Sequence, residues 1–103
     1  MDTMQPPEEQ IRTVQLYLDR EFPHQVRETW WDQNTMAQIF EISDGSVLRH
    51  IVVDLGFFQQ CPDFATELRN SELVDYIRES RAPRRCFRVT WNEKAIHVRS
   101  RPL

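Results

Sequence analysis

The sequence predicts an α+β fold, a two-layer sandwich in which helices cover one face of an antiparallel five-stranded sheet. Three observations predict it: an apolar stripe at helical spacing opens the chain, three strand-forming segments follow, and a second pair of strands comes after another helical stretch. The expected order is α-β-β-β-α-β-β. A chain of 103 residues has the length of one domain. We therefore expect a flexible tail over residues 1–6 and a single domain over residues 7–103.

A first helix is expected over residues 7–22. Proline fits the first helical turn, and the acidic Glu8 and Glu9 suit the positive end of the helix dipole. The apolar stripe consists of Ile11, Val14, Leu18 and Phe22. Pro23 then ends the helix.

Three strands are expected next, over residues 24–32, 35–43 and 47–55. All three segments are rich in β-branched and aromatic residues. Asp44 and Gly45 give the strongest hairpin signal in the chain, because both residue types tolerate a positive φ. These segments should form an antiparallel meander.

The middle of the chain predicts a turn and then helix. Residues 56–61 are expected to turn the chain, and Pro62 and Asp63 open a helical segment. Ser71 is the expected N-cap of a second helical segment, which must stop before Pro83.

A second hairpin is expected from about residue 85 to residue 101, with a two-residue loop at 92–93. That loop would place Val89 opposite Ile96. Alternation puts the aromatic Phe87 and Trp91 on one face of this hairpin and its basic residues on the other.

The composition excludes several functions. With only 2 glycines, the chain has no Walker loop, Rossmann turn or glycine-rich cradle. No apolar stretch approaches the length of a membrane span, and the acidic start is no signal peptide. The cysteines and histidines are scattered singly, so we expect no metal and no cofactor. A reduced cytoplasmic protein without membrane contact is predicted.

The charge is unevenly distributed along the chain. Acidic residues dominate up to position 77, arginines dominate from Arg78 onward, and the net charge is −3. An acidic body with a basic end favours either a self-complementary assembly or a local patch for an anionic partner. The alternative is that the two ends neutralise each other within one fold.

The basic face of the last hairpin is the first candidate site. It comprises Arg84, Arg88, His97, Arg99 and Arg101. Such arrays bind phosphate backbones. Single-stranded RNA also needs exposed aromatic residues for stacking, and here they have the opposite parity. The alternative is a solvated face whose charges prevent edge aggregation.

The adjacent Trp30 and Trp31 are the second candidate site. Neighbours in a strand point to opposite faces, so one of the two must lie on the outer face of the sheet. Exposed tryptophans are typical of interface anchors. The alternative is that a helix end or the tail covers the outer tryptophan.

Two further sets could carry chemistry. His50 and Asp54 share strand parity, with Glu41 and Asp44 nearby, and a hydrolase could use a carboxylate as base and a histidine as acid. Acids at turns and strand ends are also ordinary. Cys61 could have a lowered pKa at a helix N-terminus, or be a small buried hydrophobic residue, which is the reading we favour. No catalytic motif accompanies these residues.

The expected order of elements resembles that of the type III secretion chaperones. The likeness lies in element order and acidic charge over nearly the whole chain, although those chaperones have a final helix where this sequence ends on a strand. The resemblance implies a dimer that binds a segment of another protein.

Our first hypothesis is a non-enzymatic protein-interaction module, adaptor or chaperone-like, that forms a homodimer. RNA binding through the basic hairpin and a small hydrolase near His50 and Asp54 are the alternatives.

Overall fold

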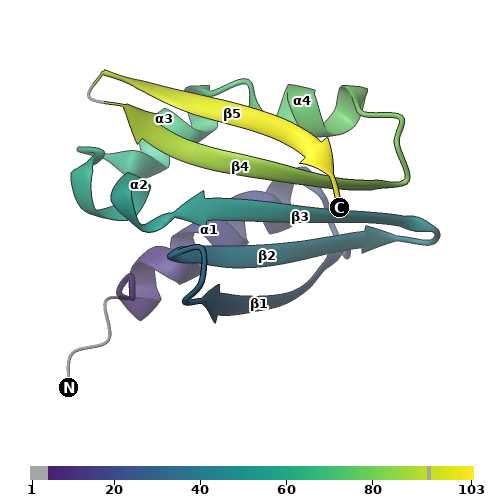
Figure 1. Ribbon diagram of the computed structural model, residues 1–103, viewed down its shortest axis with the longest axis horizontal. Helices are drawn as coiled ribbons and strands as arrows, with labels where there is room; N and C mark the ends of the chain where they lie inside the picture. Colours follow the sequence, from purple (N-terminus) through teal and green to yellow (C-terminus); the bar gives the residue numbers. More distant parts are fainter. Residues whose placement is uncertain (1–4, 93) are drawn as a thin grey trace.

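The computed structural model describes residues 5–92 and 94–103 and contains one five-stranded sheet in the order β1-β2-β3-β4-β5 (Figure 1). It confirms the α+β class. The elements in chain order are α1 (Glu8–Glu21), β1 (Val26–Asp32), β2 (Ala37–Asp44), β3 (Val47–Asp54), α2 (Leu55–Gln60), α3 (Phe64–Asn70), α4 (Leu73–Glu79), β4 (Arg84–Asn92) and β5 (Ala95–Pro102). None of these helices is long and apolar enough to cross a membrane.

Helix α1 forms where the apolar stripe predicts it. Pro7 precedes the first turn, which carries Glu8 and Glu9. The stripe buries Val14 and Leu18 completely. Phe22 ends the helix, and its backbone N–H donates to the Leu18 carbonyl at 2.7 Å.

The sheet is mixed, so the prediction of a purely antiparallel sheet is wrong. Strands β1, β2 and β3 form the expected antiparallel meander. The turn between β2 and β3 contains Gly45, which has a φ of 62°. Strand β4, however, pairs with β3 in parallel, with Ile51 opposite Phe87. The chain leaves the end of β3 through three short helices and returns to the starting end of β3 before β4 begins. Such a crossover produces a parallel pair.

The connection between β3 and β4 is more helical than expected. Residues 56–61 were expected to turn the chain, but α2 occupies most of that stretch and buries Phe57 and Phe58. Burial of these rings outweighs the low helix propensity of Gly56. Ser71 joins α3 to α4: its hydroxyl donates to the Leu68 carbonyl at 2.7 Å and accepts from the Leu73 N–H at 3.3 Å.

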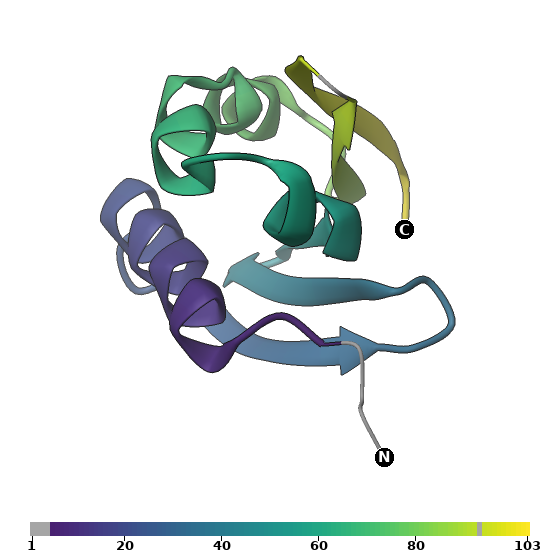
Figure 2. The same cartoon turned by 90° about the vertical axis from the view of Figure 1, so that its left-hand side faces the viewer.

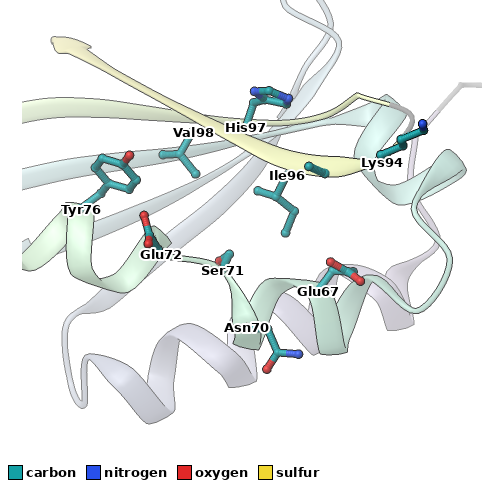
Figure 3. Close-up of a pocket in the computed structure, with 10 residues that line it drawn as sticks. Glu67, Asn70, Ser71, Glu72, Tyr76, Lys94, Ile96, His97 and Val98 are labelled. Carbon is teal, nitrogen blue, oxygen red and sulfur yellow. The ribbon is translucent and has the colours of Figure 1, made fainter.

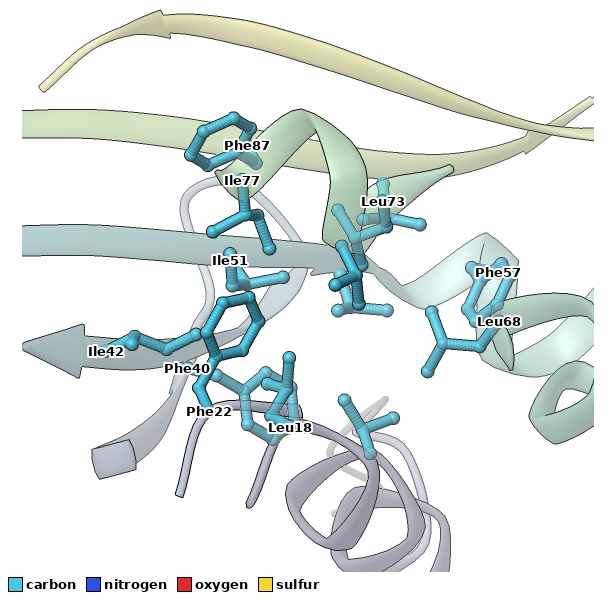
Figure 4. Close-up of a cluster of buried hydrophobic side chains, with 14 of the residues drawn as sticks. Leu18, Phe22, Phe40, Ile42, Ile51, Phe57, Leu68, Leu73, Ile77 and Phe87 are labelled. Atoms are coloured by element: carbon cyan, nitrogen blue, oxygen red, sulfur yellow. The ribbon is translucent and has the colours of Figure 1, made fainter. Parts of the chain in front are cut away.

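Figure 2 shows α1, α3 and α4 on one side of the sheet, and Figure 4 shows the main core, to which side chains of the helices and of the sheet contribute. Figure 4 shows side chains of β2, β3 and β4 directed towards those of the helices. The largest fully buried members are Phe40, Phe57, Phe87, Leu18, Ile42, Ile51, Leu68, Leu73 and Ile77.

The final hairpin has the expected parity but a different register. Val89 pairs with Val98 rather than with Ile96, and Trp91 pairs with Ile96. The loop lies one residue later than expected, because Asn92 still pairs with Ala95 as the last residue of β4. Residue 93, part of the expected loop, lies outside the described residues. The observed register gives cross-strand pairs of apolar residues on the core side.

Candidate interaction site

The open face is the sheet surface formed by the strand residues that point away from α1, α3 and α4. Its centre is a small apolar group, separate from the main core and contributed by β2, β3 and β4: Ala37, Ile39, Val52 and Cys86. These side chains are at most 8% exposed. What the open face can bind therefore depends on the residues that surround this group.

Trp30 lies on the open face, whereas Trp31 points to the side of the helices. The pairing of β1 with β2 places Trp30 opposite Ile39 and Trp31 opposite Gln38. Trp30 is 37% exposed. Its ring meets the His50 ring edge-on, with 5.3 Å between centroids and an interplanar angle of 84°. The two tryptophans thus lie on opposite faces, as strand alternation predicts.

His50 contacts a carboxylate, but not that of Asp54. His50 Nε2 lies 3.3 Å from Glu41 Oε1 on the neighbouring strand. The Asp54 carboxylate instead accepts a hydrogen bond from Arg88. His50 and Asp54 therefore do not make the hydrogen bond that a general acid–base pair would use. Asp44 is exposed at the end of β2, where it closes the hairpin opposite Val47.

Arg88 is held inside the fold by two acceptors. Its Nη2 donates to Asp54 Oδ1 on β3 and to the Thr35 carbonyl, at 3.1 Å, in the turn between β1 and β2. The Arg88 and Asp54 side chains are each about 70% buried, with 30% and 29% exposed. Arg88 therefore links β4 to the end of β3 and to the turn between β1 and β2.

We expect the Arg88→Met variant to lose about 1–3 kcal/mol of unfolding free energy, because the Asp54 carboxylate and a backbone carbonyl lose their donor. Urea titration followed by circular dichroism measures this loss. Arg12→Met is the matched control, since Arg12 is exposed on α1, away from the open face; its unfolding free energy should change by no more than about 0.5 kcal/mol. Equal losses in the two variants would contradict the assignment of Arg88 as a structural tie.

The other predicted basic residues are exposed on the open face. Arg88 lies opposite Arg99, and His97 lies opposite Thr90. A cavity of about 290 Å³ is lined by Arg88, Thr90, Asn92, His97 and Arg99. Arg84 and Arg101 also belong to the open face but do not line this cavity. Phe87 and Trp91 pack on the core side, so neither forms a stacking surface beside it.

The open face is divided by charge. Its acidic residues lie on β1, β2 and β3: Glu28, Asp32, Glu41 and Asp54. Its arginines lie on β4 and β5: Arg84, Arg88, Arg99 and Arg101. The order of the strands in the sheet follows their order in the chain. The charge asymmetry along the sequence thus becomes an asymmetry across one surface.

Cys61 does not have the environment of a nucleophile. Burial raises the pKa of its thiol, and the nearby Glu67 and Asp63 add to the rise. The side chain is only 6% exposed and belongs to the main core. Asp63, rather than the cysteine, is the N-cap of α3: its carboxylate accepts a hydrogen bond from the Thr66 N–H at 3.4 Å.

Two hollows on the helix side were not predicted from the sequence. One, of about 400 Å³, lies between β5 and the α3–α4 region. Figure 3 shows Ile96 and Val98 pointing into it and His97 pointing away. Tyr76 at its rim is 45% exposed. The other hollow, of about 670 Å³, lies between α1 and α3 beside Leu16, which is 62% exposed.

Tyr17 lines the α1–α3 hollow together with Leu16, and its phenol stays protonated at neutral pH. Burial raises the pKa of Tyr17 to about 12, and the Glu21 carboxylate contributes to the rise. Leu16 lies outside the apolar stripe of α1, and this position in the sequence indicates that its side chain is exposed.

No group of three or more histidine, cysteine, aspartate or glutamate residues that could hold a metal ion occurs within residues 5–92 and 94–103. Comparison of the chain with protein-family models, with curated proteins and with solved structures finds no match in any of the three.

Proposed function

We propose that this protein is a non-enzymatic protein-interaction module in which helices and sheet form two layers and the open face binds a second copy of the chain. The observation that carries the proposal is the division of the open face into an acidic and a basic half, with the exposed Trp30 in the acidic half. A surface with both charges in separate halves is complementary to itself.

Trp30 has the features of an interface anchor. Binding hot spots are enriched in tryptophan, and an anchor already held in place loses little side-chain entropy on binding. The edge-on contact with His50 restrains the Trp30 ring, and Glu41 restrains the His50 ring in turn. The surrounding charged residues resemble the polar rim of a protein interface.

The test is sedimentation equilibrium of the purified chain at two ionic strengths. We expect a dimer at about 0.01 M salt, where the Debye length is about 30 Å, and weaker association at 1 M salt, where it is about 3 Å. The weakening follows because salt screens attraction between the two halves. A chain that stays monomeric at all concentrations in low salt would overturn the proposal.

Binding of a nucleic-acid backbone is the second candidate function, favoured by the cation-lined cavity of about 290 Å³ on β4 and β5. Phosphate contacts of this kind produce salt-sensitive binding. The test is a mobility-shift assay with single-stranded RNA at low salt. Arg99→Ala should weaken any shift while leaving the structural tie through Arg88 intact. Absence of a shift with the wild-type chain would exclude this function.

A further inference from the structure

We infer that the two copies meet open face to open face about a two-fold axis parallel to β3, so that β1 of each copy lies over β5 of the other. The inference rests on the proposed self-association and specifies its partner surface. Its first support is the order of the strands: β1 and β5 are the two edges of the sheet, and β3 is its middle.

Two rows of open-face residues run across the sheet at right angles to the strands. Strand pairing connects the first row in the order Trp30, Ile39, Val52, Arg88, Arg99. It connects the second row in the order Glu28, Glu41, His50, Cys86, Arg101. Each row therefore has an acidic or aromatic residue at the β1 edge and an arginine at the β5 edge.

The charges distinguish between the two limiting ways of stacking two such faces with two-fold symmetry, with the axis at right angles to the strands or parallel to them. An axis that lies in the interface at right angles to the strands would place β1 over β1 and β5 over β5. The acidic and aromatic residues of β1 would then meet one another, and Arg99 and Arg101 would meet arginines. An axis parallel to the strands places β1 over β5, so that opposite charges meet on both sides of the axis.

The parallel axis gives each edge residue a partner of suitable chemistry. Trp30 lies over Arg99 of the second copy, where a guanidinium can stack on the indole ring. Glu28 lies beside Arg101 of the second copy, where a bidentate ion pair can form. Symmetry repeats each contact. Val52 lies near the axis, so the axis passes over the buried apolar group and the exposed residues around that group make the contacts.

Exposure and available partners agree with this arrangement. Glu28, Arg99 and Arg101 are exposed. Within the described part of the chain, none of their side chains makes a hydrogen bond or an ion pair, whereas Arg88 and Asp54 satisfy each other. The uncommitted charges thus include those at the two edges, where the parallel axis requires them. Stacked sheets lie about 10 Å apart, a gap that long side chains such as arginine and tryptophan can span.

The experiment is a charge exchange measured by sedimentation equilibrium at low salt. We expect Glu28→Arg and Arg101→Glu each to weaken self-association about tenfold or more, the size of a lost interfacial ion pair. The double variant should associate within about threefold of the wild type, because the exchanged charges attract again across the axis. Asp19→Arg and Arg12→Glu are the matched controls, since both residues are exposed on α1, and neither should change association.

The outcomes separate the inference from the proposed function. If the double variant is as weak as the single variants, the axis is wrong while self-association through the open face stands. If the single variants associate like the wild type, the edge pairing is wrong. A wild-type chain without self-association would remove the proposed function itself. Should either reversal prevent folding, Glu28→Gln and Arg101→Gln test the same pair, and each should weaken association.

Discussion

Replacing Phe40 by alanine should lower the free energy of unfolding by about 3–5 kcal/mol, the usual cost of removing a buried aromatic ring. Phe40 is completely buried on β2, between its neighbours Thr29 on β1 and Ile51 on β3. It points to the helices, as Figure 4 shows, so the cavity would open where α1 meets the sheet. The expected loss is a large part of the total stability of a domain of this size.

Urea unfolding monitored by circular dichroism measures the effect of Phe40→Ala. Leu16→Ala is the control, because Leu16 is 62% exposed beside the hollow between α1 and α3; the change in its unfolding free energy should stay within about 0.5 kcal/mol. A loss below about 1 kcal/mol for Phe40→Ala would mean that β2 does not bury this ring. The open-face residues of β2 alternate with Phe40 along the strand, so their assignment to the open face would then be wrong as well.

Replacing Trp30 by alanine should weaken self-association about thirtyfold or more, which corresponds to the 2 kcal/mol or more typical of an interfacial hot spot. The reason is that Trp30 is exposed on the open face and held in position by His50. Sedimentation equilibrium at low salt measures the dissociation constant. Circular dichroism establishes that the variant is folded.

Tyr76→Ala is the matched control for Trp30→Ala. Tyr76 is also an exposed aromatic residue, at 45%, but it lies on α4 beside the hollow under β5. Its removal should leave the dissociation constant unchanged. If Tyr76→Ala weakened association and Trp30→Ala did not, the interface would lie on the helix side rather than on the open face.

Local patterns predicted the elements better than their connections. The stripe of α1 and the glycine turn between β2 and β3 are determined by residues a few positions apart, so the sequence reveals them. The parallel pairing of β3 with β4 is not local, because Ile51 and Phe87 meet only after the intervening helices have formed. Helix α2 was missed because burial of Phe57 and Phe58 decides it, and burial depends on the whole fold.

In the candidate site, too, local patterns predicted some features, whereas others depend on contacts between distant parts of the chain. Strand alternation predicts that Trp30 and Trp31 lie on opposite faces, but only the pairing with β2 shows which one faces outward. The basic residues of the last hairpin were expected to act together. Arg88 differs from the others because its acceptors, Asp54 and Thr35, lie 34 and 53 positions away in the chain. No local pattern could reveal those contacts.

The most direct test of the central claim, that the open face binds a second copy, is a dilution series at low salt followed by ¹H–¹⁵N nuclear magnetic resonance. The chain has 3 tryptophans, and each indole N–H gives its own signal. We expect the Trp30 signal to move as the protein is diluted, while those of Trp31 and Trp91 stay in place. A constant Trp30 signal, with changes confined to Leu16 or Tyr76 on the helix side, would contradict the account.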